Sequence, residues 1–148
     1  MDIRIAAYGV IIRDAQILLT HWNEHGRSGW TLPGGGVEGP EHPLEAARRE
    51  IREETGYEAS VDRLLGIDTM VIPASKRHSA NTPLYAMRVI YRASVVGGSL
   101  RSEIDGSSDE ARWFALDEVP QLKRVSLLDI ALRLNTAEAA DGRPPAAR

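Results

Sequence analysis

The hydrophobic positions of this chain follow the two-residue period of β-strands over most of its length and the helical period in two stretches. Runs of apolar and β-branched residues predict strands at 3–12, 16–20, 30–32, 84–96 and 111–115. A weaker alternation over 58–69 predicts one or two strand pieces, broken at Gly66. Apolar residues at helical spacing predict helices at 43–55 and 126–135. Elements in this order predict an α+β fold with a mixed β-sheet between helices.

Polar and glycine-containing stretches separate these elements. Residues 13–15 predict the turn of a first hairpin, and Gly97-Gly98 predicts the turn of another. Polar loops are expected at 21–28, 73–83 and 101–109, and a helical turn is expected at 117–120. From Thr136 onward the composition is rich in Ala, Gly and Pro. We therefore expect one folded domain over residues 1–135 and a flexible C-terminal tail over 136–148.

Both predicted helices carry terminal signals. Pro43 suits the first helical position after His42, and Gly56 suits a left-handed C-terminal cap. Ser126 is the candidate N-cap of the second helix. In the first helix an apolar stripe is formed by Leu44, Ala47 and Ile51.

Three acidic residues of the first helix share one face. Glu50, Glu53 and Glu54 stand at i, i+3 and i+4, close to the C-terminal end, where the helix dipole disfavours anions. A bound cation would offset this repulsion, and three oxygen ligands suit Mg²⁺ or Mn²⁺. The alternative is a solvated charged face that is neutralised by neighbouring arginines. Those arginines are Arg48, Arg49 and Arg52.

The whole stretch of residues 35–57 resembles the signature box of the Nudix hydrolases. The box has a glycine, a glutamate after five residues, and an Arg-Glu-bulky-any-Glu-Glu-any-Gly-bulky run after seven more. The matching positions are Gly35, Glu41, Arg49, Glu50, Ile51, Glu53, Glu54, Gly56 and Tyr57. Tyr57 stands where the family more often has an aliphatic residue. The resemblance implies the Nudix α/β/α sandwich.

This resemblance also implies an activity, which is hydrolysis of a phosphoanhydride in a nucleoside diphosphate linked to another group. It implies Glu50, Glu53 and Glu54 as ligands of Mg²⁺ or Mn²⁺, together with the backbone carbonyl of Gly34. It implies that Arg49 orients the glutamates, and that one of the glutamates helps deprotonate water. For Glu41, at the helix start, a structural role and a catalytic role stay open.

Many family members take their general base from a loop outside the box. Four acids occupy such a position before the strand at Trp113, and Glu110 is our first choice among them. The others are Glu103, Asp105 and Asp109. An ordinary acidic surface loop is the alternative interpretation.

Residues other than the three glutamates are expected to contact the substrate. Trp22 is a candidate to stack on a nucleobase, Arg77 to contact the distal half, and Gly35 to let backbone approach the phosphates. A solvated loop is the alternative for both side chains. Pro73 lies sixteen residues after Tyr57, a spacing similar to that of the ADP-ribose pyrophosphatase subgroup. A MutT-like nucleoside triphosphate pyrophosphatase and a non-catalytic nucleotide sensor stay as alternatives.

Composition restricts the partners that the chain is expected to have. The net charge of −3 disfavours a broad nucleic-acid surface but permits a small nucleotide substrate. The chain has no cysteine, which excludes disulfides and a thiol nucleophile. No signal peptide or membrane span is recognised in the sequence, so we expect a cytoplasmic protein without membrane partners. Whether it forms a homodimer stays open.

Overall fold

The computed structural model describes residues 1–102, 106, 108–137 and 141–146. Within these residues the chain forms strands, two α-helices and two short 3₁₀ helices, at Ala74–Lys76 and Leu116–Gln121. The helices are α1 (Pro43–Thr55) and α2 (Ser126–Thr136). The strands are β1 (Asp2–Arg13), β2 (Gln16–Glu24), β3 (Arg27–Thr31), β4 (Gly34–Gly36), β5 (Tyr57–Ile72), β6 (Leu84–Gly98) and β7 (Ser108–Ala115).

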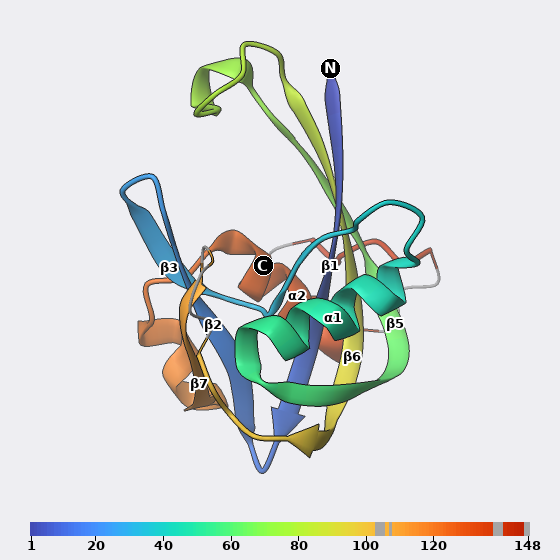
Figure 1. Cartoon of the computed structure of the whole chain (residues 1–148), viewed down its shortest axis with the longest axis vertical. Coiled ribbons are helices and arrows are strands. Elements are labelled where there is room, and N and C mark those ends of the chain that lie inside the picture. Colours follow the sequence, from blue (N-terminus) through green and yellow to red (C-terminus); the bar gives the residue numbers. More distant parts are fainter. Residues whose placement is uncertain (103–105, 107, 138–140, 147–148) are drawn as a thin grey trace.

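The strands form one mixed sheet, which lies between the two helices (Figure 1). Its main order is β3-β2-β1-β6-β5, with β4 added on β1 and β7 added on β2. Among the strands that the structure describes, only β1 and β6 run parallel, from Asp2 opposite Leu84 to Ile11 opposite Ala93. The other strand pairs are antiparallel. The predicted α+β fold with a mixed sheet between helices is thereby confirmed.

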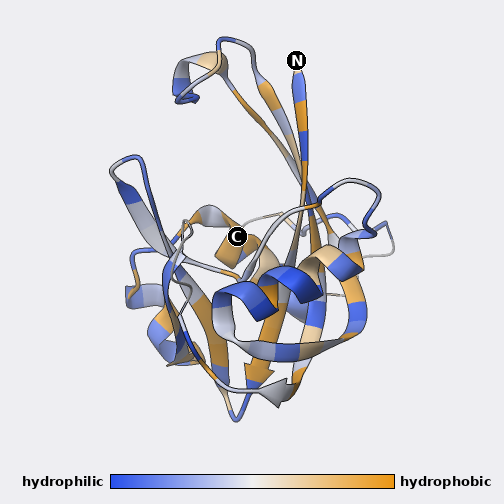
Figure 2. Cartoon of the chain, viewed as in Figure 1, coloured by the Kyte–Doolittle hydropathy of each residue, from blue (hydrophilic) through white to orange (hydrophobic). Residues whose placement is uncertain are grey.

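Apolar side chains on the two faces of the sheet form separate cores under the two helices. On one face Ile51 of α1 packs with Ile11 and Leu18. On the other face Leu128 and Leu134 of α2 pack with side chains from β1, β2 and β6. Figure 2 shows apolar strands through the body and a hydrophilic outer side on α1. Burial of both sheet faces explains why α1 is held firmly enough to position its other side chains.

Part of the sheet projects beyond the body (Figure 1). This projection, here called the arm, consists of residues 2–5 of β1, the adjoining ends of β5 and β6, and the connection 73–83. Apolar side chains on the arm are exposed, including Ile3 and Val71. The hairpin of β2 and β3 projects beside it. These two projections bound the cavity described below.

Three local predictions are corrected by the structure. The segment 21–28, expected as a loop, continues β2 to Glu24 and begins β3 at Arg27, because its residues pair across a tight turn. Gly97-Gly98 is not a hairpin turn, since both glycines end β6 and pair with Glu58 and Tyr57. β5 is continuous through Gly66, where a register shift absorbs the irregularity.

Helix boundaries agree with most of their signals. His42 caps α1 by accepting a hydrogen bond from the Leu44 N–H, and Gly56 adopts φ of 81° in the left-handed cap. The N-cap of α2 is Val125 rather than Ser126, which is the first helical residue. The expected turn at 117–120 lies within the 3₁₀ helix Leu116–Gln121.

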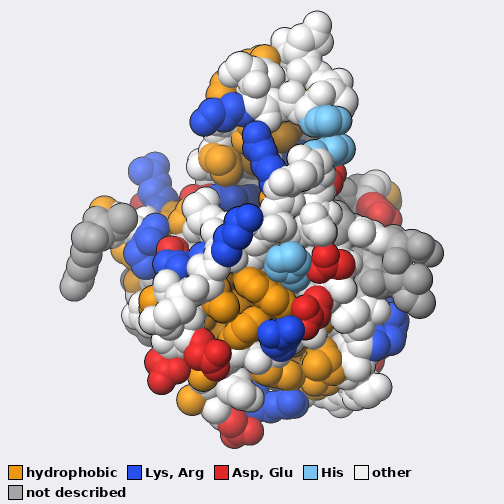
Figure 3. All heavy atoms as spheres, turned by 90° about the vertical axis from the view of Figure 1, so that its left-hand side faces the viewer, with side chains coloured by type: hydrophobic (Ala, Val, Ile, Leu, Met, Phe, Trp, Pro, Cys, Tyr) orange, Lys and Arg blue, Asp and Glu red, His pale blue; other side chains and the backbone are white. Residues whose placement is uncertain are grey.

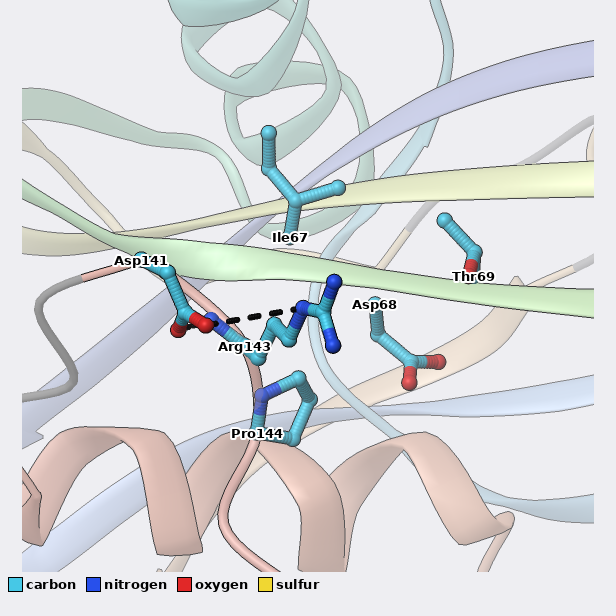
Figure 4. Close-up of a pocket in the computed structure, with 7 residues that line it drawn as sticks. Ile67, Asp68, Thr69, Asp141, Arg143 and Pro144 are labelled. Atoms are coloured by element: carbon cyan, nitrogen blue, oxygen red, sulfur yellow. Dashed lines mark hydrogen bonds and ion pairs between the residues drawn. The ribbon is translucent and has the colours of Figure 1, made fainter.

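The described part of the C-terminal segment lies against β5 (Figure 4). The Ile67 N–H donates to the Gly142 carbonyl at 2.8 Å, and Asp141 pairs with Arg143 at 3.5 Å. A cavity of about 640 Å³ lies between this segment and Ile67–Thr69. Residues 138–140 and 147–148 of the predicted tail lie outside the described residues. Among the helices that the structure describes, none has the length and apolar character that crossing a membrane requires.

Candidate active site

A cavity of about 1170 Å³ lies between the arm, the β2–β3 hairpin and the C-terminal part of α1. Its lining includes Glu50, Glu53 and Glu54, here called the glutamate cluster, and the glycines of β4. The side opposite is lined by residues of the arm and of the hairpin. Figure 3 shows Lys and Arg side chains on the projecting part of the molecule and a hydrophobic surface below it. The cavity therefore places acidic and basic groups around one space.

Glu54 is the buried member of the glutamate cluster, with 6% of its surface exposed. The Gly34 N–H donates to one of its carboxylate oxygens at 2.7 Å. The Ser108 hydroxyl donates to the other oxygen at 2.6 Å. Both donors are neutral, so they orient the carboxylate without neutralising its charge. A buried carboxylate held in this way is suited to face a cation.

Glu50 lies directly against the glycine strand β4. A Cβ atom on Gly35 would come within 2.7 Å of the Glu50 carboxylate carbon, which is closer than such atoms approach. Glycine at position 35 therefore makes room for this carboxylate. The structure thus gives a physical reason for a glycine at the first position of the box.

Arg49 joins the residues of the box through its guanidinium, and 16% of its side chain is exposed. Two of its nitrogens donate to Glu41 at 3.0 and 2.9 Å, in a bidentate pair. It also donates to Glu50 at 3.0 Å, to the Gly36 carbonyl at 3.0 Å and to Glu53 at 3.3 Å. The guanidinium therefore ties the helix to β4 and to the loop between them.

Glu41, in the loop before α1, accepts the bidentate hydrogen bonds of Arg49. Hydrogen bonds from Arg49, and then from the Glu38 backbone N–H, lower the pKa of Glu41 to about 2. The same carboxylate, followed by Glu50, raises the pKa of Arg49. Glu41 is not among the residues that line the cavity. Of the two roles left open by the sequence, these contacts favour the structural one.

The oxygen donors along this side of the cavity are chemically suited to a hard divalent cation. The glutamate cluster and Gly34 all line the same space. Among the residues that the structure describes, no three Asp, Glu or His side chains are grouped closely enough to enclose an ion. Glu53 is 45% exposed and contacts Arg49, so a metal site built here requires its side chain to rearrange.

Two of the three predicted substrate contacts, Trp22 and Arg77, lie on the opposite side of the same cavity. Trp22 lines the cavity from strand β2, and its ring N–H donates to Glu24 at 3.1 Å. Arg77 lines it from the arm, where it donates to Asp2 and to the Thr82 carbonyl, each at 2.7 Å. Gly35 lines it from β4. The structure therefore brings these three residues and the glutamate cluster to one space.

Two histidines connect the hairpin with the arm. His25 at the hairpin tip stacks on His78, with ring centroids 3.8 Å apart and an angle of 19° between the planes. Both side chains line the cavity. Since they come from different projections, this contact joins the two structures that bound the cavity.

The structure describes two of the four acids before Trp113, Asp109 and Glu110. Glu110 lies on β7 and pairs with Arg112, and it is not among the described residues that line the cavity. Asp109 accepts hydrogen bonds from Asn23 and His21, which lower its pKa. Glu103 and Asp105 lie outside the described residues. The structure therefore does not bring Glu110 together with the glutamate cluster.

Several cavity residues were not singled out from the sequence. Ser108 carries no local motif, and only strand pairing brings it to Glu54. Arg4 lines the cavity from β1, and its guanidinium lies 3.7 Å from the position a Cβ would take on Gly36. Met70 and Ile72 line it from the arm. The one available signal was the even spacing of Arg4 and Tyr8 on a predicted strand, which did not indicate the face.

Comparison with known proteins identifies the class to which this fold and box belong. A family model described as the NUDIX domain matches residues 3–132. The chain therefore belongs to the Nudix hydrolase family.

Individual relatives show how far this similarity extends. An ADP-ribose pyrophosphatase of Methanocaldococcus jannaschii is 34% identical over 119 residues, which is 80% of this chain and 65% of that protein. A MutT-like protein of Streptomyces ambofaciens is 30% identical over 145 residues, which is 97% of this chain and 81% of that protein. A solved NUDIX hydrolase from Nitrosomonas europaea superposes with a TM-score of 0.75 at 25% identity, covering 96% of this chain and 92% of that one. The chain spans less than two thirds of the length of the Methanocaldococcus protein.

Proposed function

We propose that this protein is a metal-dependent hydrolase of a phosphoanhydride in a nucleoside diphosphate linked to another group. The observation that carries the proposal is the buried Glu54 carboxylate, held by Gly34 and Ser108 beside Glu50 and Glu53. Acidic side chains gathered in a cavity are costly unless a cation offsets their repulsion. The same cavity has room for a nucleotide-sized substrate.

The glutamate cluster and the Gly34 carbonyl would hold Mg²⁺, with Mn²⁺ as the alternative ion. When bound, such an ion neutralises phosphate charge and lowers the pKa of a water molecule. The protein's own contribution is to orient the carboxylates through Arg49, Gly34 and Ser108. The glycines of β4 let the backbone come close to the phosphates. A carboxylate of the cluster would accept the proton of the attacking water.

For the substrate we propose ADP-ribose or a related nucleoside diphosphate sugar. Pro73 and Arg77, which belong to the arm, and Trp22, which belongs to the hairpin, line the cavity outside the box. Trp22 would stack on the base, and Arg77 would contact the distal half. The name of the Methanocaldococcus relative, an ADP-ribose pyrophosphatase, supports this choice. The name of the Streptomyces relative supports the second candidate, a MutT-type nucleoside triphosphate pyrophosphatase.

A substrate panel tests both candidates. ADP-ribose, nucleotide sugars, and common and oxidised deoxynucleoside triphosphates are supplied at equal concentration with Mg²⁺ or Mn²⁺, and both products are identified. We expect the highest kcat/KM with ADP-ribose, giving a nucleoside monophosphate and a phosphorylated sugar. Preference for a triphosphate with release of pyrophosphate would replace the substrate but keep the hydrolase. Binding without turnover of any compound would favour the nucleotide sensor instead.

A further inference from the structure

Ser108 occupies a position that the box does not account for. It is 4% exposed, and its hydroxyl donates to Glu54 at 2.6 Å. The residue belongs to β7, far along the chain from α1. Of the residues described between β6 and Trp113, Ser108 is the one that lines the cavity. The contact therefore links the strand after the acidic loop to the buried carboxylate.

A bulge in the β2–β7 pairing determines that Ser108 reaches this site. His21 lies opposite Glu110, whereas the next residue, Trp22, lies opposite Ser108. Asp109 is thus the extra residue of the bulge, and its two carboxylate oxygens bind His21 at 2.7 Å and Asn23 at 3.1 Å. Because a bulge changes the face on which following side chains lie, it re-aims Ser108 relative to Glu110.

From this geometry we infer that Ser108 is a positioning residue for Glu54. Its hydroxyl and the Gly34 N–H approach the carboxylate from two different strands and hold one oxygen each. Together they fix the orientation in which Glu54 faces the cavity, while leaving its charge in place. The inference rests on the proposed function, because the orientation matters to the reaction only if Glu54 binds the metal.

The expected effect of removing the Ser108 hydroxyl follows from what is known of groups that orient metal ligands. Loss of such a group typically lowers metal affinity or activity by about 10- to 100-fold. The hydroxyl contacts neither the nucleotide base nor the distal half of the substrate in this scheme. Its removal should therefore lower kcat and weaken metal binding, while the KM of the nucleotide stays close to its wild-type value.

The test compares Ser108→Ala with Ser108→Thr, which retains a hydroxyl, and with a matched control. Thr20→Val is that control, because Thr20 is a buried β2 residue whose hydroxyl has no hydrogen-bond partner among the described residues. Four quantities are measured. These are Mn²⁺ affinity of the substrate-free protein by water-proton relaxation, the kcat and KM of the nucleotide substrate, and the melting temperature in chelator.

We expect Ser108→Ala to bind Mn²⁺ about 10- to 100-fold more weakly and to lose kcat by a similar factor. Ser108→Thr should recover most of both, and Thr20→Val should change neither by more than about twofold. Wild-type Mn²⁺ affinity and turnover in Ser108→Ala would overturn the positioning role and leave the proposed function standing. Equal losses in Ser108→Ala and Thr20→Val, in step with their melting temperatures, would also overturn it. A wild-type protein that neither binds Mn²⁺ nor turns over would instead reject the proposed function, and this inference with it.

Discussion

The two sides of the cavity are built in opposite ways. On the α1 side, Glu54 and Arg49 are held by several short hydrogen bonds from β4, β7 and the preceding loop. On the arm side, Arg77 is held by Asp2 and Thr82, but the guanidinium of Arg4 makes no hydrogen bond or ion pair within the described part of the chain. Val71, which lines the cavity on this side, is exposed. The α1 side is cross-linked around its carboxylates, whereas the arm side combines one fixed arginine with side chains that solvent still reaches.

This difference separates two requirements of the proposed hydrolase site. Groups that orient a metal must hold their geometry within a fraction of an ångström, so they are cross-linked by charged hydrogen bonds. Groups that recognise the variable half of a substrate need not be arranged so tightly before it binds. We therefore expect substitutions on the α1 side to act on kcat and those on the arm side to act on KM.

The largest effect is expected from Glu54→Gln. The amide lacks the ligand charge, so the activation free energy should rise by several kcal/mol. This corresponds to a fall in kcat of at least roughly 100-fold. The fold should persist, because Ser108 can accept a hydrogen bond from the new amide. Steady-state kinetics with Mg²⁺ and circular dichroism check both statements. Near-native turnover would exclude Glu54 as a ligand.

Arg49→Lys should have the next largest effect. A lysine cannot reproduce the bidentate bond to Glu41 together with the bonds to Glu50 and Gly36. We expect kcat to fall about 10- to 100-fold, with a lower melting temperature. Arg52→Lys is the matched control, since Arg52 is an exposed residue of the same helix. Equal behaviour of the two variants would contradict the role of Arg49.

Arg4→Ala is expected to have a smaller effect, which falls on KM instead of kcat. If its guanidinium contacts a substrate phosphate, loss of one charged hydrogen bond of about 1.5 kcal/mol should raise KM roughly tenfold, with kcat little changed. Arg63→Ala controls for charge, because Arg63 is exposed on β5 away from the cavity. A fall in kcat at unchanged KM would assign Arg4 to the metal side and remove the contrast between the two sides.

The pH dependence of stability should show the cross-linking of the α1 side directly. The pKa of Glu41 is lowered from 4.5 to about 2 in the folded protein, so its ionised form favours folding. This stabilisation is fully present above pH 4.5 and is lost as the pH falls toward about 2. Urea melts of wild type and Glu41→Gln should therefore differ most at neutral pH and converge on acidification. A constant difference across this range would mean that the carboxylate charge is not what stabilises the loop.

The smallest effect is expected from Glu110→Gln. Its carboxylate is paired with Arg112 on an exposed part of β7, and such pairs contribute about 0–1 kcal/mol. We expect kcat to change by less than about threefold. A loss of 100-fold or more would instead support Glu110 as the general base predicted from the sequence.

The elements and the box were predictable because their signals are local. Pro43, Gly56 and the spacing of the glutamates specify α1 within a few turns of chain. The bond from Ser108 to Glu54 depends on a bulge in a pairing between β2 and β7, which no local pattern reveals. Gly97 and Gly98 illustrate the same limit, because a glycine pair that is typical of a turn instead ends β6 beside Tyr57. The register between distant strands therefore determines which side chains meet, and sequence spacing alone does not predict that register.

The parallel pairing of β1 with β6 has a consequence for how the chain reaches this structure. β1 precedes the other elements within this sequence and lies in the middle of the sheet, yet its neighbour β6 begins only at Leu84. Contacts between such distant segments require closure of a long loop, and they slow folding. The centre of the sheet cannot assemble on the ribosome until β6 has emerged, so the edge of β1 that pairs with β6 stays unpaired after α1 has been synthesised. Nascent chains arrested before Leu84 should accordingly remain open to proteolysis in β1, whereas chains arrested well after Gly98 should protect it.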